Sequence, residues 1–127
     1  MLAERLIQRA VFGHLRTRSM TGVFAFHPAN GGYRKPVEAA IFNGLGVVAG
    51  VPDVIAFRLS KAYALELKTE RGKLSPAQEA ALEKLEAAGV ICAVAYGLDE
   101  ALAQLEAWQL LRGKSVASAS PAVRCVA

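Results

Sequence analysis

Asp53, Glu66 and Lys68, in the centre of the chain, have the side-chain types and the spacing that hydrolysis of a phosphate ester requires. They lie in two runs of β-prone residues, 53–59 and 61–69, and the short interval between these runs predicts an antiparallel hairpin. If the hairpin is symmetrical about its turn, Asp53 lies opposite Glu66. Because like charges opposed across strands are destabilising, this pairing favours a positive group between the two carboxylates.

A divalent cation fits two opposed carboxylates well. Mg²⁺ and Mn²⁺ prefer oxygen ligands and keep several waters, so two carboxylates and a backbone carbonyl leave positions for a phosphate oxygen and an attacking water. Lys68 lies on the strand face of Glu66, and its ammonium can orient that water or offset charge on the phosphate. The alternative interpretation is a turn aspartate beside an ordinary solvated strand face.

The hairpin must turn near Leu59 and Ser60, and one of its faces must pack on a core. Side chains alternate between the two faces of a strand, so the apolar and charged residues of the second run separate. The core face then holds Tyr63, Leu65 and Leu67, and the other face holds Ala64, Glu66 and Lys68.

Helical periodicity and turn residues predict the elements that surround the hairpin. In chain order they are a helix over 2–17, a weak strand over 23–26, a short helix from Pro36 to Gly44 and Gly46, a helix from the Ser75-Pro76-Ala77-Gln78 capping box to Gly89, a buried strand over 90–96, and a helix capped by Asp99 and ended by Gly113.

This order predicts one mixed α/β domain over residues 1–112, followed by a flexible tail over 113–127. Trp108 belongs to the last predicted helix, where we expect a core or dimer contact rather than a platform for base stacking.

The overall composition excludes several classes of protein. With 127 residues, 54% of them hydrophobic and 20% charged, the chain can form a single buried core. It has no apolar run of the ~18 residues that a membrane span needs, and no leader-like N-terminus, so we expect a cytoplasmic protein. Two isolated cysteines argue against a disulfide scaffold or a zinc finger. The net charge of +4 permits a polyanionic partner.

The central motifs resemble the PD-(D/E)XK nuclease superfamily and, within it, the VRR-Nuc family of phage and bacterial nucleases. Four elements carry the resemblance, in order and at family-like spacing: Asn30-Gly31-Gly32, Gly50-Val51-Pro52-Asp53, Glu66-Leu67-Lys68 and Ser75-Pro76-Ala77-Gln78. The similarity extends from about Glu4 to Leu111. It implies a restriction-endonuclease-like α/β core, in which helices flank a central mixed β-sheet.

The resemblance also implies roles for individual residues. Asp53, Glu66 and the Leu67 carbonyl would bind Mg²⁺ or Mn²⁺, and Lys68 would be the catalytic lysine. Gln78 would reach the metal-bound water or a phosphate, although it also occupies the third helical position of a capping box.

Glu4 looks like the carboxylate that many members carry on the first helix, binding the metal directly or through a water. It shares a stripe with Ile7, Val11 and Leu15, which would direct it at the core, where a carboxylate needs a partner. The alternative is a favourable charge near the helix N-terminus. Gln8, one turn further, is a weaker candidate.

Further polar residues near the central motifs are candidates for DNA contacts, because basic side chains that bind phosphates supply most sequence-independent affinity. They are His27, Asn30, Arg34, Lys35, Arg71 and Lys73, with Arg5, Arg9, Arg16 and Arg18 on and after the first helix.

The sequence and the resemblance together predict a divalent-metal-dependent DNA endonuclease with no covalent intermediate and no organic cofactor. The resemblance adds branched, flap or four-way junction DNA as substrate, in replication, recombination or repair in a bacterial or phage-infected cell. It also adds a homodimer, for which the last helix offers an apolar surface. The alternative from another class is a non-catalytic DNA-binding accessory module with the same fold.

Overall fold

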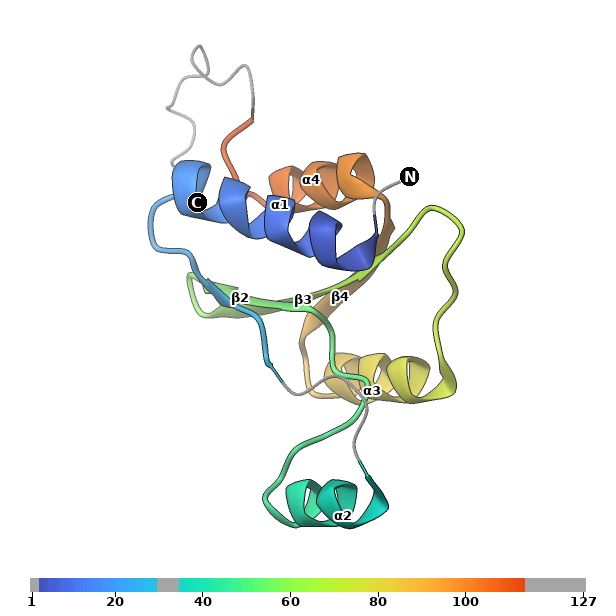
Figure 1. Cartoon of the computed structure of the whole chain (residues 1–127). Helices are drawn as coiled ribbons and strands as arrows, with labels where there is room; N and C mark the ends of the chain where they lie inside the picture. Colours follow the sequence, from blue (N-terminus) through green and yellow to red (C-terminus); the bar gives the residue numbers. More distant parts are fainter. Residues whose placement is uncertain (1–2, 30–34, 114–127) are drawn as a thin grey trace.

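A mixed β-sheet organises the chain in a computed structural model that describes residues 3–29 and 35–113 (Figure 1). Within those residues the sheet has four strands in the spatial order β1-β2-β3-β4, with β1 to β3 antiparallel and β4 parallel to β3. The strands are β1 (Phe24–Phe26), β2 (Val54–Arg58), β3 (Lys61–Lys68) and β4 (Ile91–Tyr96). The predicted mixed α/β class is therefore confirmed.

Helices cover the two faces of the sheet unequally (Figure 1). Helices α1 (Glu4–Arg18) and α4 (Leu98–Ala107) lie together on one face, and α3 (Pro76–Ala87) lies against β4 on the other face. Helix α2 (Pro36–Gly44) stands away from the sheet and buries none of its residues. None of the helices in the described part of the chain has the length and apolar character to cross a membrane.

The central hairpin forms with the predicted register. Val54 pairs with Leu65, and Arg58 pairs with Lys61 at the closed end. Leu59 and Ser60 make the turn with φ angles of 52° and 64°. Positive φ at both turn residues is what a two-residue turn of type I′ requires, because its twist matches that of the strands. The prediction of the turn is confirmed.

The core lies between the sheet and the α1–α4 layer. Ile7, Val11 and Leu15 recur at 3.6-residue spacing on α1, and all three are buried as predicted. Burial of the apolar side chains of this core, away from water, is the main force that stabilises the fold. They pack with a cluster from β2, β3, β4, α4 and the residues that follow α4: Val54, Ala56, Tyr63, Leu65, Leu67, Ala95, Ala101, Leu102, Leu105, Leu110 and Leu111.

The last strand and the last helix depart from the prediction. Strand β4 is an edge strand, so only Ala95 among its six residues is fully buried, and the expected buried strand is wrong. Gly97, rather than Asp99, is the N-terminal cap of α4. The helix ends at Ala107 instead of near Gly113, because Gln109 turns the backbone with a φ of 64°. The chain then returns to α1 through a bridge between Ser19 and Leu111.

Two other predictions concern the C-terminal part of the chain. Trp108 caps the end of α4 and packs on Tyr63, with a ring-centroid distance of 5.1 Å, so the expected core contact is confirmed. The boundary near residue 112 stays a prediction, because residues 114–127 lie outside the described part.

Candidate active site

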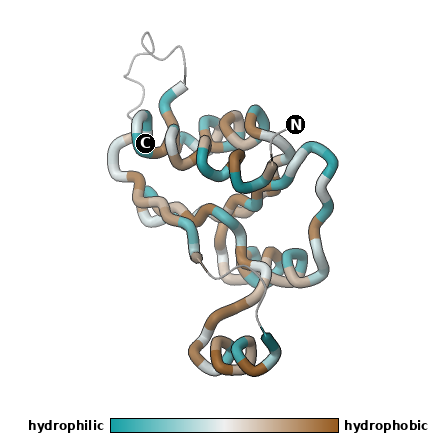
Figure 2. The backbone as a smooth tube through the Cα atoms, viewed as in Figure 1, coloured by the Kyte–Doolittle hydropathy of each residue, from teal (hydrophilic) through white to brown (hydrophobic). Residues whose placement is uncertain are grey.

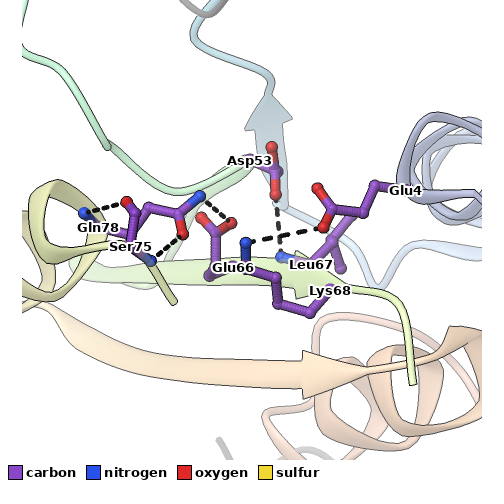
Figure 3. A network of polar contacts seen from close by, with 7 residues as sticks. All are labelled: Glu4, Asp53, Glu66, Leu67, Lys68, Ser75 and Gln78. Carbon is purple, nitrogen blue, oxygen red and sulfur yellow. Dashed lines mark hydrogen bonds and ion pairs between the residues drawn. The ribbon is translucent and has the colours of Figure 1, made fainter. Parts of the chain in front are cut away.

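The two carboxylates meet at the open end of the hairpin (Figure 3). Asp53 directly precedes β2, and extending the observed register by one residue sets it opposite Glu66. The Leu67 amide donates a hydrogen bond to Asp53 Oδ2 at 2.9 Å, which fixes the aspartate at the edge of β3. The structure therefore brings together the pair of acids that the hairpin symmetry predicted.

Glu66 is buried, with 2% of its surface exposed. Burial is the largest cause that raises the pKa of its carboxyl from 4.5 to about 8; the neighbouring Asp53 charge and a hydrogen bond to Asp53 contribute to this rise, and Lys68 opposes it. Lys68 itself is 7% exposed. The alternative interpretation of these residues as a solvated strand face is therefore wrong.

Lys68 connects the carboxylate pair to the first helix. Its Nζ lies 3.6 Å from Glu4 Oε2, and Figure 3 places the ammonium between Glu66 and Glu4. The Glu4 side chain is 46% exposed, so its predicted direction toward the core is wrong. It lies one turn before Ile7, at the end of the helix, where the buried stripe opens to solvent. The structure does bring Glu4 to the site, but as the partner of Lys68.

Gln78 serves the helix and the site at once. Its Oε1 accepts a hydrogen bond from the Ser75 amide at 2.9 Å, and its backbone amide donates to Ser75 Oγ at 3.1 Å, which completes the capping box. Its Nε2 donates to Glu66 Oε2 at 3.0 Å. The two alternatives left open for Gln78 are therefore compatible, since each uses a different atom of the amide group.

Gly50 holds the loop before Asp53 against the start of α3, a role that sequence reasoning missed. Its φ is +80°, and a Cβ there would lie 2.5 Å from the carbonyl group of Ala77 and 2.8 Å from the Gln78 nitrogen. Only glycine tolerates both the conformation and the close approach. The sequence feature that could have indicated this role is the glycine three residues before Asp53. Pro52, fully buried, fixes the same loop.

The arrangement fits a divalent cation. The raised pKa of Glu66 beside Asp53 indicates that Lys68 alone does not supply enough positive charge for both acids to ionise, and a bound cation would supply it. The Leu67 carbonyl adds an oxygen at the same edge of β3, because the N–H and C=O of one strand residue point to the same side. In the described part of the chain, no three Asp, Glu, His or Cys side chains form a cluster that could hold a metal ion. The oxygen atoms available to a cation at this edge are those of the two acids and the Leu67 carbonyl, while Glu4 is paired with Lys68.

The residues that were candidates for DNA contacts differ in their location and in their exposure. His27, directly after β1, has its Nδ1 2.8 Å from the Asp53 backbone oxygen, so it contacts the main chain of Asp53 rather than its carboxylate. Arg71 and Lys73 are exposed in the loop between β3 and α3, and Lys35 is exposed at the start of α2. Asn30 and Arg34 lie outside the described residues. Arg18 pairs with Glu106 at 2.8 Å and therefore fastens α1 to α4.

Comparisons with known proteins agree with this fold. The model of the VRR-NUC domain family matches residues 34–99, which include the hairpin, Gln78 and β4. A solved structure described as a VRR_NUC domain protein is similar over 85% of this chain and 88% of that chain, with a TM-score of 0.67 and 24% sequence identity. No curated protein compared with the chain matches it. The predicted restriction-endonuclease-like α/β core is confirmed.

Proposed function

Since the chain belongs to the nuclease-related VRR-NUC domain family, we propose that it is a divalent-metal-dependent DNA endonuclease that hydrolyses phosphodiester bonds. The observation that supports this most directly is the Asp53–Glu66 pair, in which a buried carboxyl has a pKa of about 8 beside a second acid and a lysine. Two opposed acids, one of them buried, destabilise the fold, so a purely structural role does not account for this pair.

Each side chain of the site has a chemical part in this proposal. Asp53, Glu66 and the Leu67 carbonyl would hold Mg²⁺ or Mn²⁺, which lowers the pKa of water and neutralises charge on the phosphate. Lys68 would donate hydrogen bonds to the attacking water or to a phosphate oxygen, and Glu4 holds its ammonium in place through the ion pair. Gln78 fixes the orientation of Glu66 through Nε2.

We propose branched DNA, such as a flap or a four-way junction, as the preferred substrate class. Exposed basic residues, Arg71 and Lys73, lie in the loop that follows Lys68, and we expect them to contact backbone phosphates of the substrate. Such contacts position a strand without reading its sequence, so we expect recognition of DNA structure rather than of a base sequence.

A homodimer is also part of the proposal, although the expected use of the last helix is wrong. Ala101, Leu102 and Leu105 of α4 are buried within the chain itself. Helix α2 instead leaves Ile41 and Leu45 58% and 73% exposed, and its apolar surface stands clear of the fold (Figure 2). We expect I41S/L45S to convert a dimer to a monomer in sedimentation experiments. A wild-type protein that sediments as a monomer would contradict this part.

The experiment that tests the activity compares wild type with D53N and E66Q on linear duplex, flap and four-way junction DNA. Each reaction is run with Mg²⁺, Mn²⁺ or EDTA. We expect metal-dependent cleavage in the wild type, and loss of at least a hundredfold in both variants, because each removes a charged metal ligand. E83Q is the matched control, since Glu83 is exposed in the second half of α3 and takes part in none of the contacts described for the site.

The alternative, a non-catalytic DNA-binding module, makes a different prediction for the same reactions. Such a module would bind DNA equally well with Mg²⁺ and with EDTA and would leave it intact. Cleavage that D53N and E66Q retain would refute the assignment of these two residues.

A further inference from the structure

Three phenylalanines form an exposed aromatic cluster on β1 and β2. Phe24, Phe26 and Phe57 have ring-centroid distances of 5.8 to 6.5 Å from one another. Their exposed fractions are 65%, 38% and 42%. Large aromatic side chains normally bury most of their surface. Three of them that contact one another and remain exposed to solvent therefore indicate a binding surface for a ligand or a macromolecule.

This aromatic cluster shares a sheet face with the carboxylate pair. Phe24 pairs with Phe57, and Phe26 pairs with Ile55, which lies two residues from Asp53 on the same strand. Two strand residues span about 7 Å, so the cluster begins one side-chain step from the acids. Helix α3 covers β4 on this face but leaves the β1–β2 side open (Figure 1).

An arginine-lined hollow lies between α1 and β1, on the other face of the sheet from the cluster, and the two surfaces meet at Phe26 on the edge strand. It has a volume of about 540 Å³, and its lining includes Arg5, Gln8, Arg9, Arg16, Phe26 and His27. The arginines recur on one stripe of α1, and within the described residues none of them takes part in an ion pair. Phe26 belongs to both surfaces, and His27 continues from it to the Asp53 backbone.

We propose that this edge of the sheet binds an unpaired DNA strand next to the scissile phosphate, with phosphates in the arginine-lined hollow and bases stacked on the aromatic cluster. The proposal rests on the proposed nuclease function and narrows its substrate to DNA that has a single-stranded arm at the cut. Base–aromatic stacking beside a basic groove is how proteins bind single strands without sequence preference. A closed duplex cannot offer its stacked bases to Phe24 and Phe57.

Charge decides between a nucleic acid and a second copy of this chain as the occupant. The stripe of Arg5, Arg9 and Arg16 places three positive charges in the hollow, which meets the cluster at Phe26. A second copy, with a net charge of +4, would meet these arginines with like charge. A polyanion with exposed planar groups complements both surfaces together.

The test measures equilibrium binding by fluorescence anisotropy in EDTA, so that no strand is cut. The probes are an oligo(dT) of about 16 nucleotides and an abasic strand of the same length. F24L/F57L keeps apolar volume but removes the aromatic faces, so it should weaken oligo(dT) binding roughly tenfold and leave abasic binding unchanged. R9Q/R16Q should weaken both and reduce the slope of log Kd against log salt by about 1.4, for two lost phosphate contacts.

K61Q/K84Q is the matched control, because both lysines are exposed outside the hollow and their loss changes the charge equally. Equal effects of F24L/F57L on both probes, or equal salt slopes for the two charge variants, would overturn the proposal. So would a change in sedimentation of F24L/F57L, which would assign the cluster to a protein interface. Cleavage by the wild type with Mg²⁺, measured in parallel, tests the nuclease function separately. If the wild type cleaves DNA but F24L/F57L weakens binding of both probes equally, the proposed single-strand site is refuted and the nuclease function is not.

Discussion

Metal-free protein should lose stability as the pH rises, and Glu66 should be the main cause. Its pKa is about 8 in the folded protein and 4.5 in the reference state of an unfolded chain. Between these values the folded state holds a proton that the unfolded state has released. The free energy of unfolding therefore falls with rising pH in this window, and the contribution present below pH 4.5 is lost by pH 8.

The expected size of this effect follows from the proton difference. One proton changes the free energy of unfolding by about 1.36 kcal/mol per pH unit, so two pH units inside the window correspond to roughly 3 kcal/mol. Such a loss is a large fraction of the 5–15 kcal/mol typical of a small domain. Because Glu66 is 2% exposed, solvent screens this effect little.

The E66Q variant isolates this contribution from other titrating groups. An amide at this position can still accept a hydrogen bond from Gln78 Nε2 and can donate to Asp53, but it carries no charge at any pH. Urea unfolding in EDTA at about pH 5.5 and 7.5 should therefore show E66Q gaining roughly 2–3 kcal/mol relative to wild type. The same change that abolishes cleavage should stabilise the metal-free fold.

Adding Mg²⁺ provides a second measurement on the same samples. A cation held by Glu66 favours the ionised carboxylate, so the pH dependence of the wild type should flatten while that of E66Q stays unchanged. An equal pH dependence of wild type and E66Q in EDTA would refute the description of Glu66 as a buried acid in contact with Asp53.

Three further predictions separate the roles of the residues around Glu66. K68M should lose at least a hundredfold in cleavage rate in single-turnover assays, with Mg²⁺ affinity by calorimetry nearly kept; loss of Mg²⁺ binding would instead make Lys68 a structural residue. Q78E should keep the capping box, and thus the thermal stability of α3, because a carboxylate oxygen can still accept from the Ser75 amide. It should cleave DNA more than tenfold more slowly, because a third acid replaces the donor to Glu66. Cleavage at the wild-type rate would show that Gln78 does not orient Glu66. E4Q should change the free energy of unfolding by less than about 1 kcal/mol, because the Glu4 side chain in its ion pair with Lys68 is 46% exposed, yet should slow cleavage, because Lys68 Nζ loses the partner that holds it in place; cleavage at the wild-type rate would remove Glu4 from the site.

The hairpin and its acids were predictable because their signals are local. Alternation of apolar residues fixes the face of each strand, and the turn at Leu59 and Ser60 fixes the register. Once the register is set, the opposition of Asp53 and Glu66 follows by counting. The capping box at Ser75 is likewise contained in four consecutive residues.

Features that depend on the order of strands in space were not predictable in this way. The periodicity of residues 90–96 says that they are apolar, but not that β4 lies at an edge of the sheet. The exposure of Glu4 depends on how far α1 extends beyond β3, which no residue spacing encodes. Phe57 reads as a core residue until its pairing with Phe24 on the open side of the sheet is known.

The turn of the hairpin has a consequence for how the protein folds. Leu59 and Ser60 adopt left-handed backbone conformations that cost roughly 1–2 kcal/mol per residue outside glycine. At the opposite end the fold buries the acidic side chain of Glu66 beside Asp53, which also costs free energy. The hairpin is thus locally frustrated at both ends, and its burial against α1 and α4 must hold it together. Its amides should therefore exchange with solvent deuterium only when the whole domain unfolds, whereas those of α2, which buries nothing, should exchange by local opening. The hairpin that holds Asp53 and Glu66 is therefore stable only when the whole core is folded.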